Sequence, residues 1–376
     1  MTLAGFILEK VPAHWLALLR DTEPIFFAYA ALCAMAVLPI YFGAFLAVED
    51  IKKEEAERVS SEDAYLFPVI GSAVLFSAWL VLKYLPKEYL NYFLNAYFAP
   101  VGTVAAAQVL IHLITAALPA PWTRYAAHTL SLVRDADSKL RSCWKITWPA
   151  VLSYTTAALL VAAYLLADKH WVLSNALGLA LAVTGIEAVH LDSFRTGFIL
   201  LAGLFVYDVF WVFGTEVMVS VARNFNLPIK LLFPRDIAAL WAAPDASLLQ
   251  RILSKLPLVG DASAASPASS TRFSMLGLGD IVVPGVFIAL CLRFDHHNQS
   301  KWLPYFRCTL LAYILGLVCT MVVMHVFKAA QPALLYLSPA CSLAPILVAL
   351  CRGQLAALLT FHANEPKPAT PAKKNE

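Results

Sequence analysis

Two aspartates stand out because each lies inside a long apolar segment. Asp208 is the twelfth residue of the 25-residue apolar run 197–221, and Asp280 lies in a second run, 275–292. A carboxylate deep in a bilayer costs roughly 2.5–3.5 kcal/mol on insertion scales, so it marks a functional site and needs a partner. Two such carboxylates on neighbouring helices would share one proton, since both cannot comfortably ionise where the dielectric is low. One carboxylate that activates water, beside another that protonates a carbonyl oxygen, gives an aspartic protease.

The residues beside the aspartates fit this chemistry. Gly277 and Gly279 lack a Cβ atom, so other backbones can approach Asp280 closely. They also loosen the start of the seventh predicted helix, where an extended substrate could pair its backbone. Tyr207 places a hydroxyl next to Asp208 as a hydrogen-bond donor.

The composition indicates that lipid is the solvent. Of the 376 residues, 60% are hydrophobic and only 14% are charged, whereas soluble domains contain about 25% charged residues. The net charge of +3 is spread over loops, so a nucleic-acid partner is not expected. The seven cysteines include no CxxC pair, and we expect no metal and no cofactor.

The apolar runs predict an all-α integral membrane protein with nine transmembrane helices. The nine predicted spans are 25–48, 66–85, 97–118, 148–167, 171–189, 197–221, 275–292, 305–327 and 332–350. These spans divide the chain into four parts. We expect a short N-terminal segment (1–24), a first helical group (25–189), a catalytic group with a loop at about 223–273 (190–350), and a polar tail (351–376).

The distribution of lysine and arginine predicts the orientation. The loops on one side, with the C-terminal tail, hold 16 of these residues; the other side holds six, with six more in the loop 223–273. The positive-inside rule therefore places the C-terminus in the cytosol, and the N-terminus and the long loop in the lumen. On this topology the sequon at Asn298 faces the cytosol and stays unmodified. Lys373 and Lys374 resemble the di-lysine retrieval signal of endoplasmic reticulum membrane proteins.

Three motifs carry a resemblance to a known family. They are Tyr207–Asp208 in one apolar helix, Gly277–Leu278–Gly279–Asp280 opening another, and Gln331–Pro332–Ala333–Leu334 opening the last. Together they resemble the GxGD intramembrane aspartyl proteases, which comprise the presenilins and the signal peptide peptidases. The flanking sequences YDVFWVFGT, MLGLGDIVVPG and FIALCLRFD are more similar to the signal peptide peptidases.

The resemblance implies a presenilin-like bundle in which Asp208 and Asp280 form the catalytic dyad. It implies that Pro332, Ala333 and Leu334 shape the site, and that the substrates are signal peptides and type II membrane segments in the endoplasmic reticulum. Homo-oligomers and quality-control partners stay open, as does the need for other subunits. Before the motifs are considered, a proton-coupled transporter or channel using the same aspartates is an equal alternative, and an adaptor role with an inactive dyad is a third.

Overall fold

The computed structural model describes ten stretches of the chain. They are residues 13–50, 58–59, 61–84, 87–117, 127–131, 143–167, 169–214, 228–235, 273–327 and 331–362. Lys373 and Lys374 of the predicted retrieval signal, and most of the loop 223–273, lie outside these residues.

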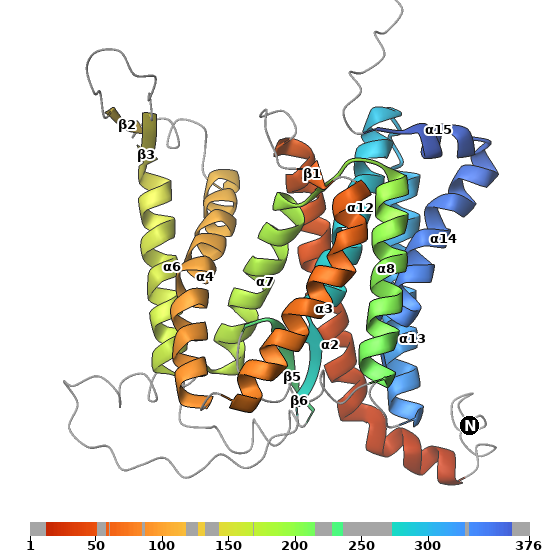
Figure 1. Ribbon diagram of the computed structural model, residues 1–376, viewed down its shortest axis with the longest axis horizontal. Helices are drawn as coiled ribbons and strands as arrows, with labels where there is room; N and C mark the ends of the chain where they lie inside the picture. Colours follow the sequence, from red (N-terminus) through yellow and green to blue (C-terminus); the bar gives the residue numbers. More distant parts are fainter. Residues whose placement is uncertain are drawn as a thin grey trace, which may run out of the picture.

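Long helices dominate the described residues and run side by side as one bundle (Figure 1). Eight of them are long and apolar enough to cross a membrane. These are α2 (Ala13–Asp50), α3 (Ser61–Tyr84), α4 (Lys87–Ala117), α6 (Trp148–Leu166), α7 (Trp171–Ala188), α8 (Phe194–Phe213), α13 (Pro304–Phe327) and α14 (Leu334–Arg352). The ninth long helix is α12 (Gly279–His297), and a short helix, α15 (Leu355–Thr360), lies across one end of the bundle. The predicted helical membrane fold is confirmed.

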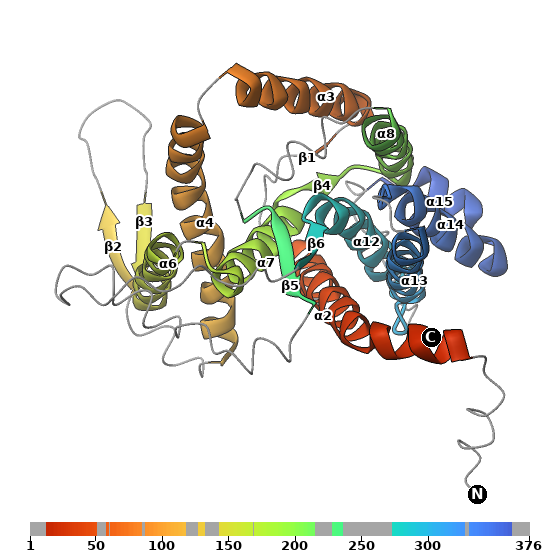
Figure 2. The ribbon, with the colours of Figure 1, turned by 90° about the horizontal axis from the view of Figure 1, so that it is seen from below.

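Helix α12 is the centre of the bundle and carries Asp280. It contacts α2, α7, α8, α13 and α14, and the view along the bundle places it among them (Figure 2). Three of its residues, Asp280, Arg293 and Asp295, are charged types, which lowers its mean hydropathy. Because other helices cover most of its surface, α12 does not need the apolar exterior of a helix that faces lipid.

Small residues let the central helices approach closely. A Cβ atom at Gly285 of α12 would lie 2.6 Å from Cδ1 of Ile186 on α7, and one at Gly43 of α2 would lie 2.9 Å from Cβ of Ile186. Three helices therefore meet around one isoleucine. Contacts of this kind hold membrane helices together where lipid removes the hydrophobic driving force.

Helix α3 joins the bundle mainly along α8, the helix that carries Asp208. A Cβ atom at Gly203 would lie 2.7 Å from Cγ of Pro68, so the two helices touch there. One turn further along α3, the indole Nε1 of Trp211 donates a hydrogen bond to Oγ of Ser72, at 3.1 Å. The remaining surface of α3 is largely exposed, as expected for a helix that faces lipid.

In the described part of the chain, three short strand pairs accompany the helices. Strand β1 (Arg58–Val59) runs parallel to β4 (His190–Leu191), and β2 (Ala127–Ser131) pairs antiparallel with β3 (Cys143–Thr147). The third pair, β5 (Lys230–Pro234) with β6 (Phe273–Gly277), is antiparallel and is called the β5–β6 ribbon below. It lies beside α7 and α12, near one end of the bundle (Figures 1 and 2).

Several predicted boundaries move. The third helix was predicted over 97–118, but α4 begins ten residues earlier, at Lys87. The seventh helix was predicted over 275–292, but residues 273–277 form strand β6 and α12 extends from Gly279 to His297. A short apolar run suits a strand as well as a helix, so periodicity alone does not separate them. The first helix begins at Ala13, ahead of the predicted start at residue 25.

Candidate active site

Asp208 lies near the end of α8 and is 4% exposed. Its Oδ2 accepts a hydrogen bond from the backbone N–H of Leu334, at 3.0 Å. These two residues are 126 positions apart in the sequence. The sixth predicted span is thereby tied to the first residue of α14, the last long helix.

The start of α14 explains this hydrogen bond. The N-cap residue is Ala333, whose side chain cannot accept a hydrogen bond from the first N–H groups of the helix. These groups have no partner within the helix and carry partial positive charge from the helix dipole. The carboxylate of Asp208 supplies the missing acceptor, and the motif 331–334 places the helix start against it.

Asp280 lies in the first turn of α12, directly after the β5–β6 ribbon. A Cβ atom at Gly277 would lie 3.4 Å from Oδ2 of Asp280, so the carboxylate rests against the bare backbone of that glycine. Among the described residues, apart from its chain neighbours and its own helix backbone, no atom lies within 4 Å of the position that a Cβ atom would take at Gly279. The two glycines thus differ: one borders the carboxylate, and the other is not in contact with any other described element.

Tyr313 of α13 holds the backbone of Asp280. Its hydroxyl donates a hydrogen bond to the carbonyl oxygen of Asp280, at 3.2 Å, and its side chain is fully buried. In a regular helix this carbonyl would accept from the N–H of residue 284, but residue 284 is proline, which has no N–H. Tyr313 therefore replaces the donor that Pro284 removes.

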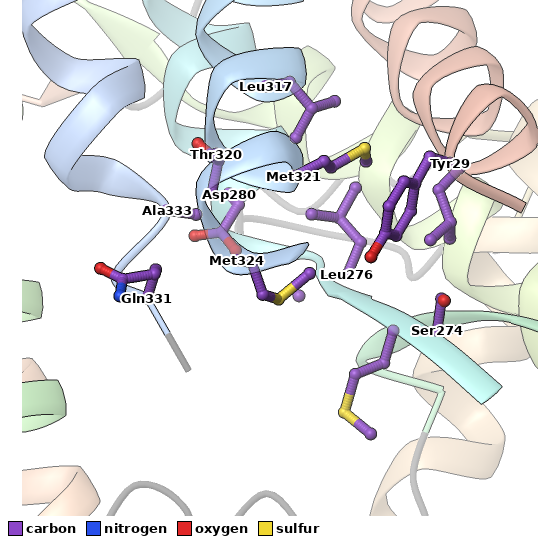
Figure 3. A pocket seen from close by; sticks show the side chains of 13 residues that line it. Tyr29, Ser274, Leu276, Asp280, Leu317, Thr320, Met321, Met324, Gln331 and Ala333 are labelled. Carbon is purple, nitrogen blue, oxygen red and sulfur yellow. The ribbon is translucent and has the colours of Figure 1, made fainter. Parts of the chain in front are cut away.

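A cavity of about 100 Å³ opens beside Asp280 (Figure 3). Its walls come from α2, β6, the first turn of α12, α13 and the residues just before α14. They consist of Tyr29, Leu32, Ser274, Met275, Leu276, Gly277, Asp280, Leu317, Thr320, Met321, Met324, Gln331 and Ala333. Apolar side chains predominate and three are methionines, which adapt to irregular shapes. The cavity suits an apolar side chain held next to a carboxylate.

The two aspartates are brought into one site. Two adjacent residues of the chain link them. Leu334 donates to Asp208, and the residue before it, Ala333, lines the cavity with Asp280. The N-termini of α12 and α14 both lie at the pair, and the positive ends of their dipoles favour one negative charge there.

The other predicted residues take different positions. Gln331 lines the cavity. The ring of Tyr207 lies against α3, since a Cβ atom at Gly71 would be 3.6 Å from its Cε2. Leu278 packs towards α7, where its Cδ1 would lie 3.5 Å from a Cβ atom at Gly178. In the ribbon, Lys230 lies opposite Gly277, and burial lowers the pKa of its ammonium group.

Comparison with known proteins shows to which family the chain belongs. The signal peptide peptidase family profile matches residues 51–250 and 252–365. The chain is 38% identical over 360 residues to the signal peptide peptidases of Homo sapiens and of Mus musculus, covering 94% of this chain and 88% of each relative. It is 35% identical over 339 residues to a probable intramembrane protease of Schizosaccharomyces pombe, covering 88% of this chain and 93% of the relative. The chain belongs to the signal peptide peptidase family.

The family assignment confirms the resemblance seen in the motifs and the predicted enzyme class. The protein is a multi-pass membrane protein and an intramembrane protease. These matches extend over most of the chain, and they give no support to the proton-coupled transporter or channel.

Sequence reasoning missed Tyr313 as part of this protease. A signal was available, because a tyrosine in the middle of an apolar span needs a partner for its hydroxyl. The proline four residues after Asp280 was also visible and removes one helix donor. What the sequence did not show is that α13 brings the hydroxyl to the carbonyl, because that contact joins residues 33 positions apart.

Proposed function

We propose that this protease cleaves signal peptides and type II membrane segments within the endoplasmic reticulum membrane, with Asp208 and Asp280 as its catalytic dyad. The observation that carries the proposal is the hydrogen bond from Leu334 to Asp208, beside the cavity that contains Asp280. This bond joins the first motif to the third, and Ala333 of the third motif lines the cavity together with Gly277 and Asp280 of the second. The relatives named signal peptide peptidase support the choice of substrate.

The mechanism uses one proton shared by the two carboxylates. The ionised carboxylate takes a proton from water, and the water oxygen bonds to the carbon of the scissile carbonyl. The protonated carboxylic acid gives its proton to the carbonyl oxygen, which forms a neutral gem-diol. When this collapses, a proton moves to the amide nitrogen, the carbon–nitrogen bond breaks, and the carboxylates again hold one proton. The shared proton belongs to the pair and not to either aspartate alone.

The surroundings of Asp280 favour a substrate that is locally unwound. A helix hides its backbone carbonyls, so the scissile bond must become extended before water can attack. Met275 and Gly277 of β6 are exposed, and Gly279 is not in contact with any other described element. A substrate strand placed along this stretch would bring a carbonyl to the dyad and an apolar side chain to the cavity.

The orientation and the division of the chain remain part of the proposal. The N-terminal segment and the loop that contains the β5–β6 ribbon are lumenal, and the C-terminal tail is cytosolic. Residues 25–189 form the first helical group, and residues 190–350 form the catalytic group. The test is the sequon at Asn298, where an endoglycosidase-sensitive mobility shift would contradict this orientation.

The function is tested with purified protein in detergent and a peptide that resembles a signal sequence. We expect cleavage by the wild type, and no cleavage by Asp208→Asn or Asp280→Asn at equal yields of folded protein. A transition-state analogue of aspartic proteases should block the wild type. Activity retained by either variant would refute the dyad. Cleavage by the purified chain alone would show that no partner subunit is required.

If the purified wild type does not cleave, a photoreactive form of the inhibitor separates two explanations. Labelling that an excess of unmodified inhibitor prevents would indicate a formed site that needs a partner subunit. Absence of labelling would refute the proposed site.

A further inference from the structure

Asn175 of α7 holds the β5–β6 ribbon with both ends of its side-chain amide. Its Nδ2 donates to the carbonyl oxygen of Leu232, at 2.6 Å, and its Oδ1 accepts from the N–H of Leu232, at 2.8 Å. Asn175 is 5% exposed. A buried side-chain amide that satisfies both backbone groups of one residue fixes the position of that residue.

The register of the ribbon shows which edge Asn175 occupies. The N–H of Leu278 donates to the carbonyl of Ile229, at 3.0 Å, and hydrogen-bonded pairs alternate along an antiparallel ladder. Leu232 and Met275 are register partners and fall at a position where no ladder bond forms. Both backbone groups of Leu232 therefore point away from β6, towards α7. Asn175 takes the place that a further strand would occupy on β5.

The same register leaves β6 with its outer edge directed away from α7. At the position of Met275 the backbone groups point away from β5, and the Met275 side chain is 52% exposed. A two-stranded ribbon is marginal by itself and presents two edges for pairing. Asn175 occupies the backbone hydrogen-bonding groups of one edge, so an incoming strand would pair with the other edge, next to Asp280.

The close packing of α7 on the ribbon supports a positioning role. Gly178 lies almost one turn after Asn175, and a Cβ atom there would be 3.2 Å from Cδ2 of Leu231 and 3.3 Å from the carbonyl oxygen of Pro228. It would also lie 3.5 Å from Cδ1 of Leu278. Leu278 is the N-cap residue of α12, two positions before Asp280. A continuous set of contacts thus runs from α7 through the ribbon to the catalytic helix.

We propose that Asn175 is a positioning residue for proteolysis. It closes the outer edge of β5 and ties the ribbon to α7, so that β6 and Asp280 keep a fixed position relative to an extended substrate. This inference rests on the proposed function. Its distinguishing consequence is that loss of Asn175 changes where the substrate is cut, in addition to how fast.

The experiment compares Asn175→Ala and Asn175→Asp with Ser174→Ala in the purified full chain. Aspartate matches asparagine in size and still accepts from the N–H of Leu232, but it places an oxygen against the carbonyl of Leu232. Ser174 is the matched control, because it is 4% exposed on the same helix and its side chain bonds to Tyr164 instead of the ribbon. Three quantities are measured: kcat and KM, the cleavage positions by mass spectrometry, and deuterium uptake by the segment 228–235.

We expect both Asn175 variants to lower kcat about tenfold or more, to cut at additional neighbouring bonds, and to take up deuterium faster in 228–235. Ser174→Ala should change none of these. Unchanged cleavage positions, or unchanged uptake in 228–235, would overturn the inference. If Asn175→Ala does not fold, Asn175→Asp decides the outcome. If the purified wild type itself does not cleave, labelling by the photoreactive inhibitor decides the proposed function, and the deuterium uptake in 228–235 still tests the anchoring of the ribbon.

Discussion

Replacing Tyr313 with phenylalanine tests whether the backbone carbonyl of Asp280 must be held for catalysis. Phenylalanine keeps the ring, so the packing between α12 and α13 is preserved. It removes the hydroxyl that donates to the carbonyl of Asp280 at 3.2 Å. Because residue 284 is proline, no helix N–H takes over, and the carbonyl is left in a buried region without its donor.

The size of the effect follows from the burial and the length of this bond. A buried polar group that loses its partner costs about 1–3 kcal/mol. If that cost is felt in the transition state, it corresponds to roughly a 5- to 150-fold decrease in kcat, since about 1.36 kcal/mol equals a factor of ten. The 3.2 Å distance exceeds the ~2.8 Å typical of hydroxyl donors. We therefore expect the lower part of this range, about 5- to 20-fold.

The assay is steady-state cleavage of a signal-sequence peptide, together with the thermal unfolding temperature of each variant. Tyr305→Phe is the control, because Tyr305 lies on the same helix, is 1% exposed, and donates to Oε1 of Gln354 at 3.0 Å. Both variants lose one hydrogen bond, so their stabilities should fall by similar amounts. Only Tyr313→Phe should lose activity.

A second change distinguishes the loss of this donor from a general defect. Pro284→Ala restores an N–H four residues after Asp280, where a helix would supply it to the carbonyl. Adding Pro284→Ala to Tyr313→Phe should therefore recover part of the lost kcat. Equal activity of Tyr313→Phe and Tyr305→Phe, or no recovery in the double variant, would refute the reasoning.

Three further predictions concern the surroundings of the dyad. Gly277→Ala places a methyl group 3.4 Å from Oδ2 of Asp280, and we expect it to lower kcat more than tenfold because the methyl group excludes water and substrate. Gly279→Ala is the control and should have a smaller effect, and an unchanged kcat in Gly277→Ala would contradict the prediction. Met321→Trp should fill the cavity of about 100 Å³. In a series of peptides that differ at the cut bond, KM should then rise for peptides with a bulky residue there and stay unchanged for peptides with alanine. Ser72→Ala removes the bond from Trp211 and should lower the unfolding temperature by the equivalent of about 1 kcal/mol, with cleavage positions unchanged.

The sequence predicted the parts of this protein that depend on composition and on local pattern. Apolar length located the long helices, and the cost of a carboxylate in hydrocarbon made Asp208 and Asp280 the candidate site residues without any structure. The boundary between β6 and α12 could not be predicted. The strand forms because β5, whose residues lie 39 to 47 positions earlier in the chain than their partners, supplies its hydrogen-bond partners, and no local signal predicts that pairing.

The supporting contacts were beyond sequence reasoning for the same reason. Tyr313, Asn175 and Leu334 each act on a residue far away in the chain, through a backbone group whose need for a partner depends on packing. Tyr207 was predicted as a hydrogen-bond donor because it is next to Asp208 in the sequence. Its ring lies against α3, and its role as a donor stays a prediction.

The hydrogen bond between Leu334 and Asp208 has a consequence for the synthesis and membrane insertion of the chain. Ribosomes make the chain from its N-terminus, so both aspartates enter the membrane before α14 exists. Until that last long helix is inserted, Asp208 lacks its donor and the cavity lacks the wall formed by Gln331 and Ala333. If Asp208 and Asp280 form the catalytic dyad as proposed, a partly synthesised chain is therefore without a complete site and cannot yet cleave membrane segments beside it.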